Sequence, residues 1–181
     1  MSFEKKSMDE LQRMNAEEFQ QADKFPIVLI LDNFRSALNV GSLFRSADAF
    51  RIEAIYCCGI TPLPPHREIL KTALGSTESV SWKHFNTTID AVKEIEHTHE
   101  VWALEQTHNS VALHTFQTPK ALALVLGNEV NGVDEEVLKL VKGSIEIEQH
   151  GTKHSLNVSV SGGIALFHLT LPSSMDDTTQ S

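Results

Sequence analysis

The sequence predicts an α/β fold in which helices flank a mostly parallel sheet. Continuous apolar runs over 27–31 and 121–126 are typical of strands that are buried on both faces of a parallel sheet. Between such runs lie segments whose apolar residues recur at helical spacing. Strands that alternate with helices indicate a parallel sheet, and ligands of such sheets bind at the carboxyl ends of the strands. We therefore expect the functional residues in the loops that follow strands.

Composition and length limit the classes of protein to which this chain can belong. The 181 residues are 41% hydrophobic and 22% charged, which fits one globular domain. No apolar run approaches the roughly 20 residues that span a bilayer, and the polar first 24 residues do not resemble a signal peptide. The two cysteines, Cys57 and Cys58, are adjacent and fit a reducing cytosol. We expect a cytoplasmic protein that makes no membrane contact.

The first half of the chain opens with an expected amphipathic helix over Met1–Lys24, which Pro26 ends. Its apolar side would carry Met8, Leu11, Met14 and Phe19. After the strand at 27–31 and a polar loop over 32–39, the spacing of apolar residues predicts a helix from Val40 to Phe50. The elements expected next are a strand at 54–58, a stiff proline loop at 61–65, a helix at 67–74 closed by Gly75, a strand at 79–85, a helix at 88–96 and a strand at 101–104.

The second half begins with the strand at 121–126, which ends in Gly127. The elements expected after it are a helix at 133–141, a short strand at 144–148, a largely apolar closing helix at 156–169 and a disordered polar tail at 173–181. The chain thus divides into an N-terminal extension (1–24), one α/β domain (25–172) and a tail.

The net charge of −9 is unevenly distributed. Residues 33–83 carry six basic and four acidic side chains, whereas residues 84–151 carry four and eleven. An anionic ligand would meet the first part, joined by Lys153 and His154, although an ordinary solvated surface explains these counts equally well.

Three loops contain unusual residues. In the first, Asn33–Arg45, Asn39 is expected to cap the following helix, and Gly41 permits close backbone approach. In the second, Gly127–Val133, two glycines flank Glu129, whose carboxylate can bind a hydroxyl or an amine. This loop is neither a dinucleotide fingerprint nor a P-loop. The third, Gln149–Gly163, puts serines, Asn157 and paired glycines where a helix begins, which indicates either function or very close packing, as in a dimer interface.

Together these loops resemble the SpoU (TrmH) family of RNA ribose 2′-O-methyltransferases, of the SPOUT superfamily. Its first pattern stands here as Asn33-Phe34-Arg35 with Asn39 to Arg45, its second as Gly127 to Gly132, and its third as Ile147 to Val160. The resemblance spans residues 27–169. It implies a catalytic domain with a C-terminal deep trefoil knot, a homodimer whose active sites use both subunits, S-adenosyl-L-methionine as methyl donor, no metal, and RNA as substrate.

The resemblance also implies roles for individual residues. Arg45 would act at the ribose 2′-hydroxyl, either as a base or, because a guanidinium hardly ever loses its proton, by binding an adjacent phosphate and orienting the hydroxyl. The implied polar residues around it are Asn39, Glu129, Ser155 and Asn157. The implied cofactor-pocket residues are Gly127, Ile147, Leu156, Leu104 and Glu105. The RNA would contact Arg35, Arg45 and Lys153.

The sequence departs from the family pattern where Glu148 and Gln149 replace a proline and a methionine of the third motif. The chain shows no separate RNA-binding domain, so we expect a small structured RNA, transfer RNA ahead of ribosomal RNA. Two alternatives remain: an RNA- or cofactor-binding dimer without transferase activity, and a flavodoxin-like nucleotide-binding protein. The histidines do not have the spacing of a metal site; they are His97, His99, His108 and His114.

Overall fold

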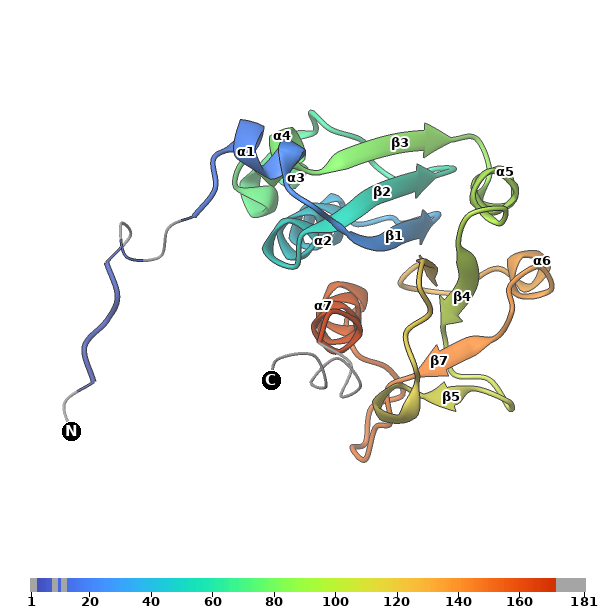
Figure 1. Ribbon diagram of the computed structural model, residues 1–181. Helices are drawn as coiled ribbons and strands as arrows, with labels where there is room; N and C mark the ends of the chain where they lie inside the picture. Colours follow the sequence, from blue (N-terminus) through green and yellow to red (C-terminus); the bar gives the residue numbers. More distant parts are fainter. Residues whose placement is uncertain (1–2, 8–9, 11–12, 172–181) are drawn as a thin grey trace.

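The computed structural model describes residues 3–7, 10 and 13–171 (Figure 1). Its strands are β1 (Phe25–Asp32), β2 (Ile52–Cys58), β3 (Ser81–Phe85), β4 (Glu100–Leu104), β5 (Val111–Ala112), β6 (Leu122–Leu126) and β7 (Ser144–Glu146). Its α-helices are α1 (Ala16–Gln21), α2 (Ala37–Ala49), α3 (Arg67–Ala73), α4 (Ser76–Ser79), α5 (Thr88–Ile95), α6 (Glu135–Leu138) and α7 (Val158–Leu169). A 3₁₀ turn, η2, covers Leu113–Thr115.

The strands form one seven-stranded sheet in the order β3-β2-β1-β6-β4-β7-β5. Every pairing in it is parallel, which confirms the predicted α/β class. The two long apolar runs, β1 and β6, are neighbours at its centre, with Leu29 opposite Leu124. The carboxyl ends of β1, β6, β4 and β7 therefore meet at one edge, where ligands bind in such sheets.

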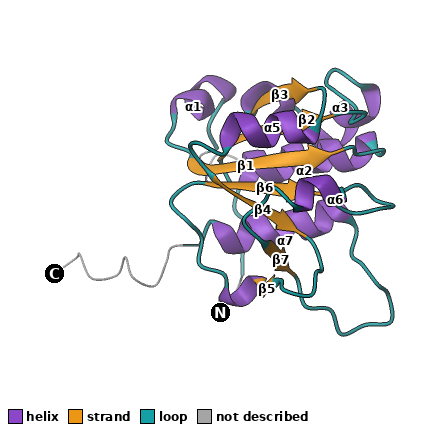
Figure 2. Ribbon diagram, turned by 90° about the vertical axis from the view of Figure 1, so that its right-hand side faces the viewer, coloured by secondary structure: helices purple, strands orange, loops and turns teal. Residues whose placement is uncertain are grey.

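Both faces of the sheet are covered by helices. Figure 2 shows α5 and α6 on one face and α2 and α7 on the other. Within β1, Leu29 and Leu31 belong to the apolar cluster under α2 and α7, and Val28 and Ile30 to the cluster under α5 and α6. All four are fully buried. This two-sided burial explains why β1 reads as a continuous apolar run rather than an alternating one.

The two thiols lie deep in β2. Burial raises the pKa of Cys57 and of Cys58 to about 12. Neither thiol is therefore a nucleophile at neutral pH. Within the described ranges, every helix is too short or too polar to cross a lipid bilayer.

The predicted N-terminal helix over 1–24 is largely wrong. Residues 3–7 and 13–15 are not α-helical, and α1 begins only at Ala16, where Asn15 and Glu18 cap each other's backbone N–H groups. Phe19 is buried as expected, but Met14 is exposed. The expected positions of Met8 and Leu11, and the tail at 173–181, lie outside the described residues. The short helix exists because its capping box supplies two local hydrogen bonds.

Several element boundaries also differ from the prediction. Residues 76–79 form α4, so the strand expected at 79–85 begins at Ser81. The helix expected at 133–141 shrinks to α6, the strand at 144–148 ends at Glu146, and α7 begins two residues late, at Val158. Leu74, with a φ of 52°, closes α3 in place of Gly75. The prediction missed β5 and η2.

Candidate functional site

The carboxyl ends of β4, β6 and β7 border a pocket of about 530 Å³. The loops after these strands and the segment that enters α7 form its walls. Every residue assigned to the cofactor pocket by the sequence lines it: Leu104, Glu105, Gly127, Ile147 and Leu156. Three of the expected polar residues line it too: Glu129, Ser155 and Asn157. The structure thus brings the second and third motifs to one pocket.

The loop from Gly127 to Val133 closes on itself. The backbone groups of Asn128 and Gly132 exchange two hydrogen bonds of 3.1 Å. Gly127 contacts the far side of the loop so closely that an added Cβ would lie 2.0 Å from the carbonyl carbon of Gly132. Glu105 fixes the end of the loop, because its Oε2 accepts the Val133 N–H at 3.0 Å. The loop therefore offers backbone groups to the pocket in one fixed arrangement.

A chain of hydrogen bonds joins the three motifs. The Asn39 side-chain amide donates to Glu129 Oε1 at 2.8 Å, and its oxygen accepts from the Asn157 amide at 3.1 Å. Glu129 also accepts the backbone N–H groups of Arg35 and Ser36, at 3.0 and 3.1 Å. Asn39 is thus the link between the second and third loops.

This arrangement corrects one prediction and adds a role. Asn39 does not cap α2; Ser36 does, its hydroxyl accepting the Asn39 N–H at 3.3 Å. Asn157 caps α7, since its Oδ1 accepts the N–H groups of Ser159 at 2.9 Å and Val160 at 3.4 Å. The side chain of Asn157 therefore both starts α7 and binds Asn39.

Glu129 is held as a carboxylate. Burial acts to raise the pKa of Glu129, but hydrogen bonds from the Asn39 side chain and from the backbone outweigh it, so the pKa lies below its usual range. At neutral pH Glu129 is therefore an acceptor and not a proton donor.

This lowered pKa predicts a pH dependence of stability. A carboxyl group with a lower pKa in the folded state stabilises the protein above its unfolded pKa, and the stabilisation is lost as pH falls through the folded value. We expect the free energy of unfolding to fall below about pH 4.5, and Glu129→Gln to lack this part of the decline. Urea unfolding from about pH 3 to 7 measures it, with the exposed Glu96→Gln as control. Identical pH profiles for wild type and Glu129→Gln would contradict the prediction.

None of the expected RNA-contacting residues lines this pocket. Arg45 lies exposed on α2 and lines a different hollow. Arg35 is exposed and contributes its backbone N–H to Glu129, and Lys153 lies exposed in the third loop. The structure therefore assembles Asn39, Glu129 and Asn157 but leaves Arg45 outside the pocket.

Some contacts near the pocket had no indication in the sequence. The Gln106 amide donates to the carbonyl of His154 at 3.3 Å and so attaches the third loop to the end of β4. Glu148, one of the two residues that differ from the family's third motif, has a partner: its Oε2 lies 3.1 Å from His114 Nδ1. Among the residues near the pocket that the sequence analysis did not name, Ser36 alone could have been predicted, because a hydroxyl residue just before a helix commonly caps it. Among the described residues, no group of three or more potential ligands is placed to hold a metal ion.

The sequence of this chain is similar to those of known proteins. The sequence model of the SpoU rRNA Methylase family matches residues 26–167. The 23S rRNA (guanosine-2′-O-)-methyltransferase RlmB of Haemophilus ducreyi is 27% identical over 165 residues, which cover 88% of this chain and 65% of that protein. An uncharacterized tRNA/rRNA methyltransferase of Borreliella burgdorferi is 28% identical, over 78% of this chain and 62% of its own length. The chain thus spans somewhat less than two thirds of these relatives.

Solved structures show the same architecture. An AdoMet-bound rRNA methyltransferase from Sinorhizobium meliloti superimposes with a TM-score of 0.74 at 27% identity, covering 81% of this chain and 56% of that one. A TrmH/SpoU tRNA modifying enzyme of A. aeolicus gives a TM-score of 0.76 at 23% identity, covering 86% and 79%. The second similarity supports the fold alone.

Proposed function

The chain belongs to the SpoU rRNA methylase family, and from this premise we propose that it transfers a methyl group from S-adenosyl-L-methionine to the ribose 2′-hydroxyl of a structured RNA. The observation that carries the proposal is the hydrogen-bond chain through Asn39. It ties the three motif loops together beside one pocket. Residues 25–172 would form the catalytic domain.

The 530 Å³ pocket fits the proposed cofactor. Its volume lies within the roughly 300–1,000 Å³ typical of small-molecule sites. Leu104, Ile147 and Leu156 would cover the flat adenine, and the backbone of Gly127 would supply polar contacts. The negative charge of Glu129 at the rim suits a ligand that carries positive charge on sulfur and nitrogen. When bound, S-adenosylmethionine supplies a methyl group on a sulfonium, from which a neutral thioether is a good leaving group.

The residues of this chain would act mainly by alignment. The hydrogen bonds that join Asn39 to Glu129 and to Asn157 hold the three loops in fixed positions relative to one another. Ser155 would add a hydroxyl at the pocket wall. In the proposed in-line displacement the ribose oxygen bonds to the methyl carbon as the carbon–sulfur bond breaks, and the hydroxyl proton passes to solvent. Reactants held in this way gain most of their acceleration from proximity and orientation. Arg45 would keep its proton, bind an RNA phosphate and orient the ribose hydroxyl, while Arg35 and Lys153 would add phosphate contacts.

A homodimer would bring Arg45 to the pocket of a second subunit. Helix α7 exposes one apolar stripe at helical spacing: Val160, Ile164 and Phe167, continued by Leu171, each between 40% and 57% exposed. We propose that a second copy covers this stripe, because monomeric proteins rarely expose such a continuous apolar surface.

We also propose the family's trefoil knot for the C-terminal part. What supports it is the strand order, in which β6 lies between β1 and β4 and β7 lies between β4 and β5. After β7 the chain returns as α7, which packs on α2.

The test is transfer of labelled methyl from S-adenosylmethionine to total RNA from a strain lacking this protein, followed by nucleoside analysis. We expect a labelled 2′-O-methyl nucleoside, first in the transfer RNA fraction, with ribosomal RNA assayed in parallel. Cofactor binding without transfer to either fraction would favour a protein that binds without catalysis. Absence of cofactor binding would overturn the proposed function.

Asn157→Ala is expected to impair both cofactor binding and turnover. The variant removes the cap of α7, which costs about 1 kcal/mol of stability, and leaves the amide oxygen of Asn39 without its donor. Calorimetric titration of S-adenosylmethionine, steady-state methyl transfer and thermal melting measure the three effects. Asn86→Ala, at an exposed asparagine distant in sequence, serves as control. Unchanged kinetics would remove Asn157 from the site.

A further inference from the structure

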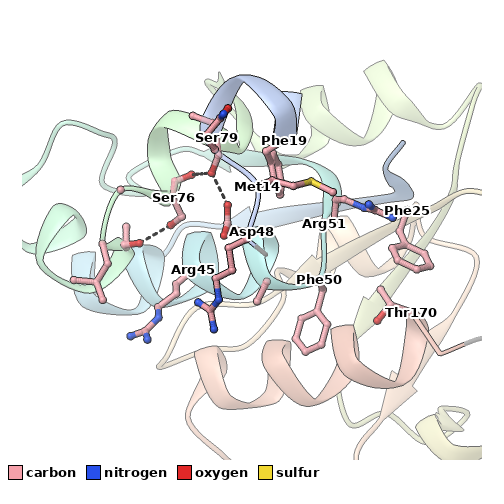
Figure 3. A pocket seen from close by; sticks show the side chains of 17 residues that line it. Met14, Phe19, Phe25, Arg45, Asp48, Phe50, Arg51, Ser76, Ser79 and Thr170 are labelled. Atoms are coloured by element: carbon pink, nitrogen blue, oxygen red, sulfur yellow. Dashed lines mark hydrogen bonds between the residues drawn. The ribbon is translucent and has the colours of Figure 1, made fainter. Parts of the chain in front are cut away.

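A second and larger hollow, of about 960 Å³, shares no lining residue with the cofactor pocket. It lies between the segment 13–19, the start of β1, the C-terminal turn of α2 and helix α4 (Figure 3). Arg45 lines this hollow, so the residue proposed to orient the target ribose stands at its border. Whatever occupies the hollow is therefore close to the point of methyl transfer.

The hollow is positively charged in a chain whose net charge is −9. Arg13, Arg45 and Arg51 line it, against one acidic side chain, Asp48. The Asp48 carboxylate accepts a hydrogen bond of 2.5 Å from the Ser79 hydroxyl, and Figure 3 shows it between Arg45 and Arg51. Across the ranges 3–7, 10 and 13–171, none of the three arginines forms an ion pair. These guanidinium groups remain available to an anion.

The positive charge of Arg51 also affects the pKa of a neighbouring residue, Lys24. Burial, followed by repulsion from Arg51, lowers the pKa of Lys24, and the opposing attraction of acidic residues is smaller. Lys24 lies beside the hollow rather than in its lining, with its ammonium 4.1 Å from the centre of the Phe19 ring. A fourth cation therefore lies against Phe19, a residue of the lining.

Aromatic rings stand next to these charges. Phe25 is 38% exposed at the start of β1. Phe50 is half-buried and packs edge-on against Phe167, with ring centres 6.3 Å apart. Flat rings beside arginines are typical of sites for unstacked nucleotides, where a base stacks and a phosphate is bound by guanidinium groups. A site for a simple anion would not need exposed rings.

We propose that this hollow binds a nucleotide of the substrate RNA that neighbours the methylated one. Arg13 and Arg51 would bind its phosphate, and its base would lie against Phe25 or Phe50. The inference rests on the proposed function, since it takes the ligand to be the same RNA whose ribose Arg45 orients. It gives the segment 13–19 a role in selecting the nucleotide next to the target.

The test compares the full chain with a double variant, Arg13→Ala with Arg51→Asn. Asparagine is chosen because Arg51 has a φ of 50°, a left-handed conformation that asparagine tolerates well. The control is Lys93→Ala, which removes one exposed positive charge from α5 on the opposite face of the sheet. The probes are unfractionated transfer RNA and total ribosomal RNA, in binding titrations at several salt concentrations.

We expect the double variant to bind its preferred RNA at least about tenfold more weakly. The slope of log affinity against log salt should also fall, by about 0.7 for each phosphate that the variant no longer binds. Cofactor affinity should be unchanged, and the KM for RNA should rise more than kcat falls. RNA affinity equal to that of Lys93→Ala would overturn the inference. If the double variant melts early, Arg13→Glu alone repeats the comparison at an exposed position.

The two proposals fail in different ways. A wild-type protein that transfers no methyl to either RNA would overturn the proposed function, while the binding titrations would still decide whether the hollow is an RNA site. A wild type that methylates RNA, with a double variant of equal RNA affinity, would leave the function intact and overturn only the hollow.

Discussion

Arg45→Ala is expected to reduce methyl transfer at least about 100-fold while cofactor affinity and the proposed dimer stay unchanged. Arg45 is exposed and does not line the cofactor pocket of its own chain, so its loss leaves that pocket as it is. Its proposed work, binding a phosphate and orienting a hydroxyl, occurs only when RNA is present. The measurements are kcat with labelled cofactor, calorimetric titration of S-adenosylmethionine, and light scattering for the oligomeric state.

Arg45→Lys separates charge from geometry. Lysine keeps the positive charge but lacks the planar fork that binds a phosphate through two parallel hydrogen bonds. We expect partial recovery of RNA affinity and little recovery of kcat. A variant that loses the dimer would instead show that Arg45 stabilises the subunit contact.

Gly127→Ala is expected to abolish cofactor binding and to destabilise the fold by about 3 kcal/mol. The new Cβ would lie 2.0 Å from the carbonyl carbon of Gly132 and 2.1 Å from the nitrogen of Val133. These are backbone atoms, which cannot rotate away as the end of a side chain can, so the loop over 127–133 must open. Thermal unfolding and titration of S-adenosylmethionine measure the two effects.

Gly151→Ala is the matched control. Gly151 belongs to the third loop, and a Cβ built on it meets no atom within 4 Å. We expect its stability to stay within about 0.5 kcal/mol of wild type. Equal cofactor affinity in the Gly127 and Gly151 variants would show that the closed loop is not needed for binding.

The sequence correctly predicted the elements that form because of a local pattern of residues. The central strands were found because burial on two faces requires continuous apolar runs. Elements held by tertiary contacts were missed or misjudged. The two residues of β5 have no pattern of their own and are strands only because they pair with β7.

Asn39 shows the same division within the candidate site. Asparagine favours helix caps, so the local preference assigned it to a cap, but Ser36 stands three residues earlier and takes that role. The side chain of Asn39 binds Glu129 and Asn157, which are 90 and 118 residues away in the chain. No local pattern encodes such contacts. The family resemblance supplied these residues, and the structure supplied the bonds between them.

The outermost strands of the sheet, β3 and β5, differ from its central strands in how readily another strand could pair with them. An all-parallel sheet with an apolar centre would aggregate if its outermost strands could add further strands. On one side β5 offers only two residues, and on the other β3 carries Lys83, paired with Glu94 at 3.7 Å. Both borders are therefore poor templates for the addition of strands from another chain, which is the first step of cross-β aggregation.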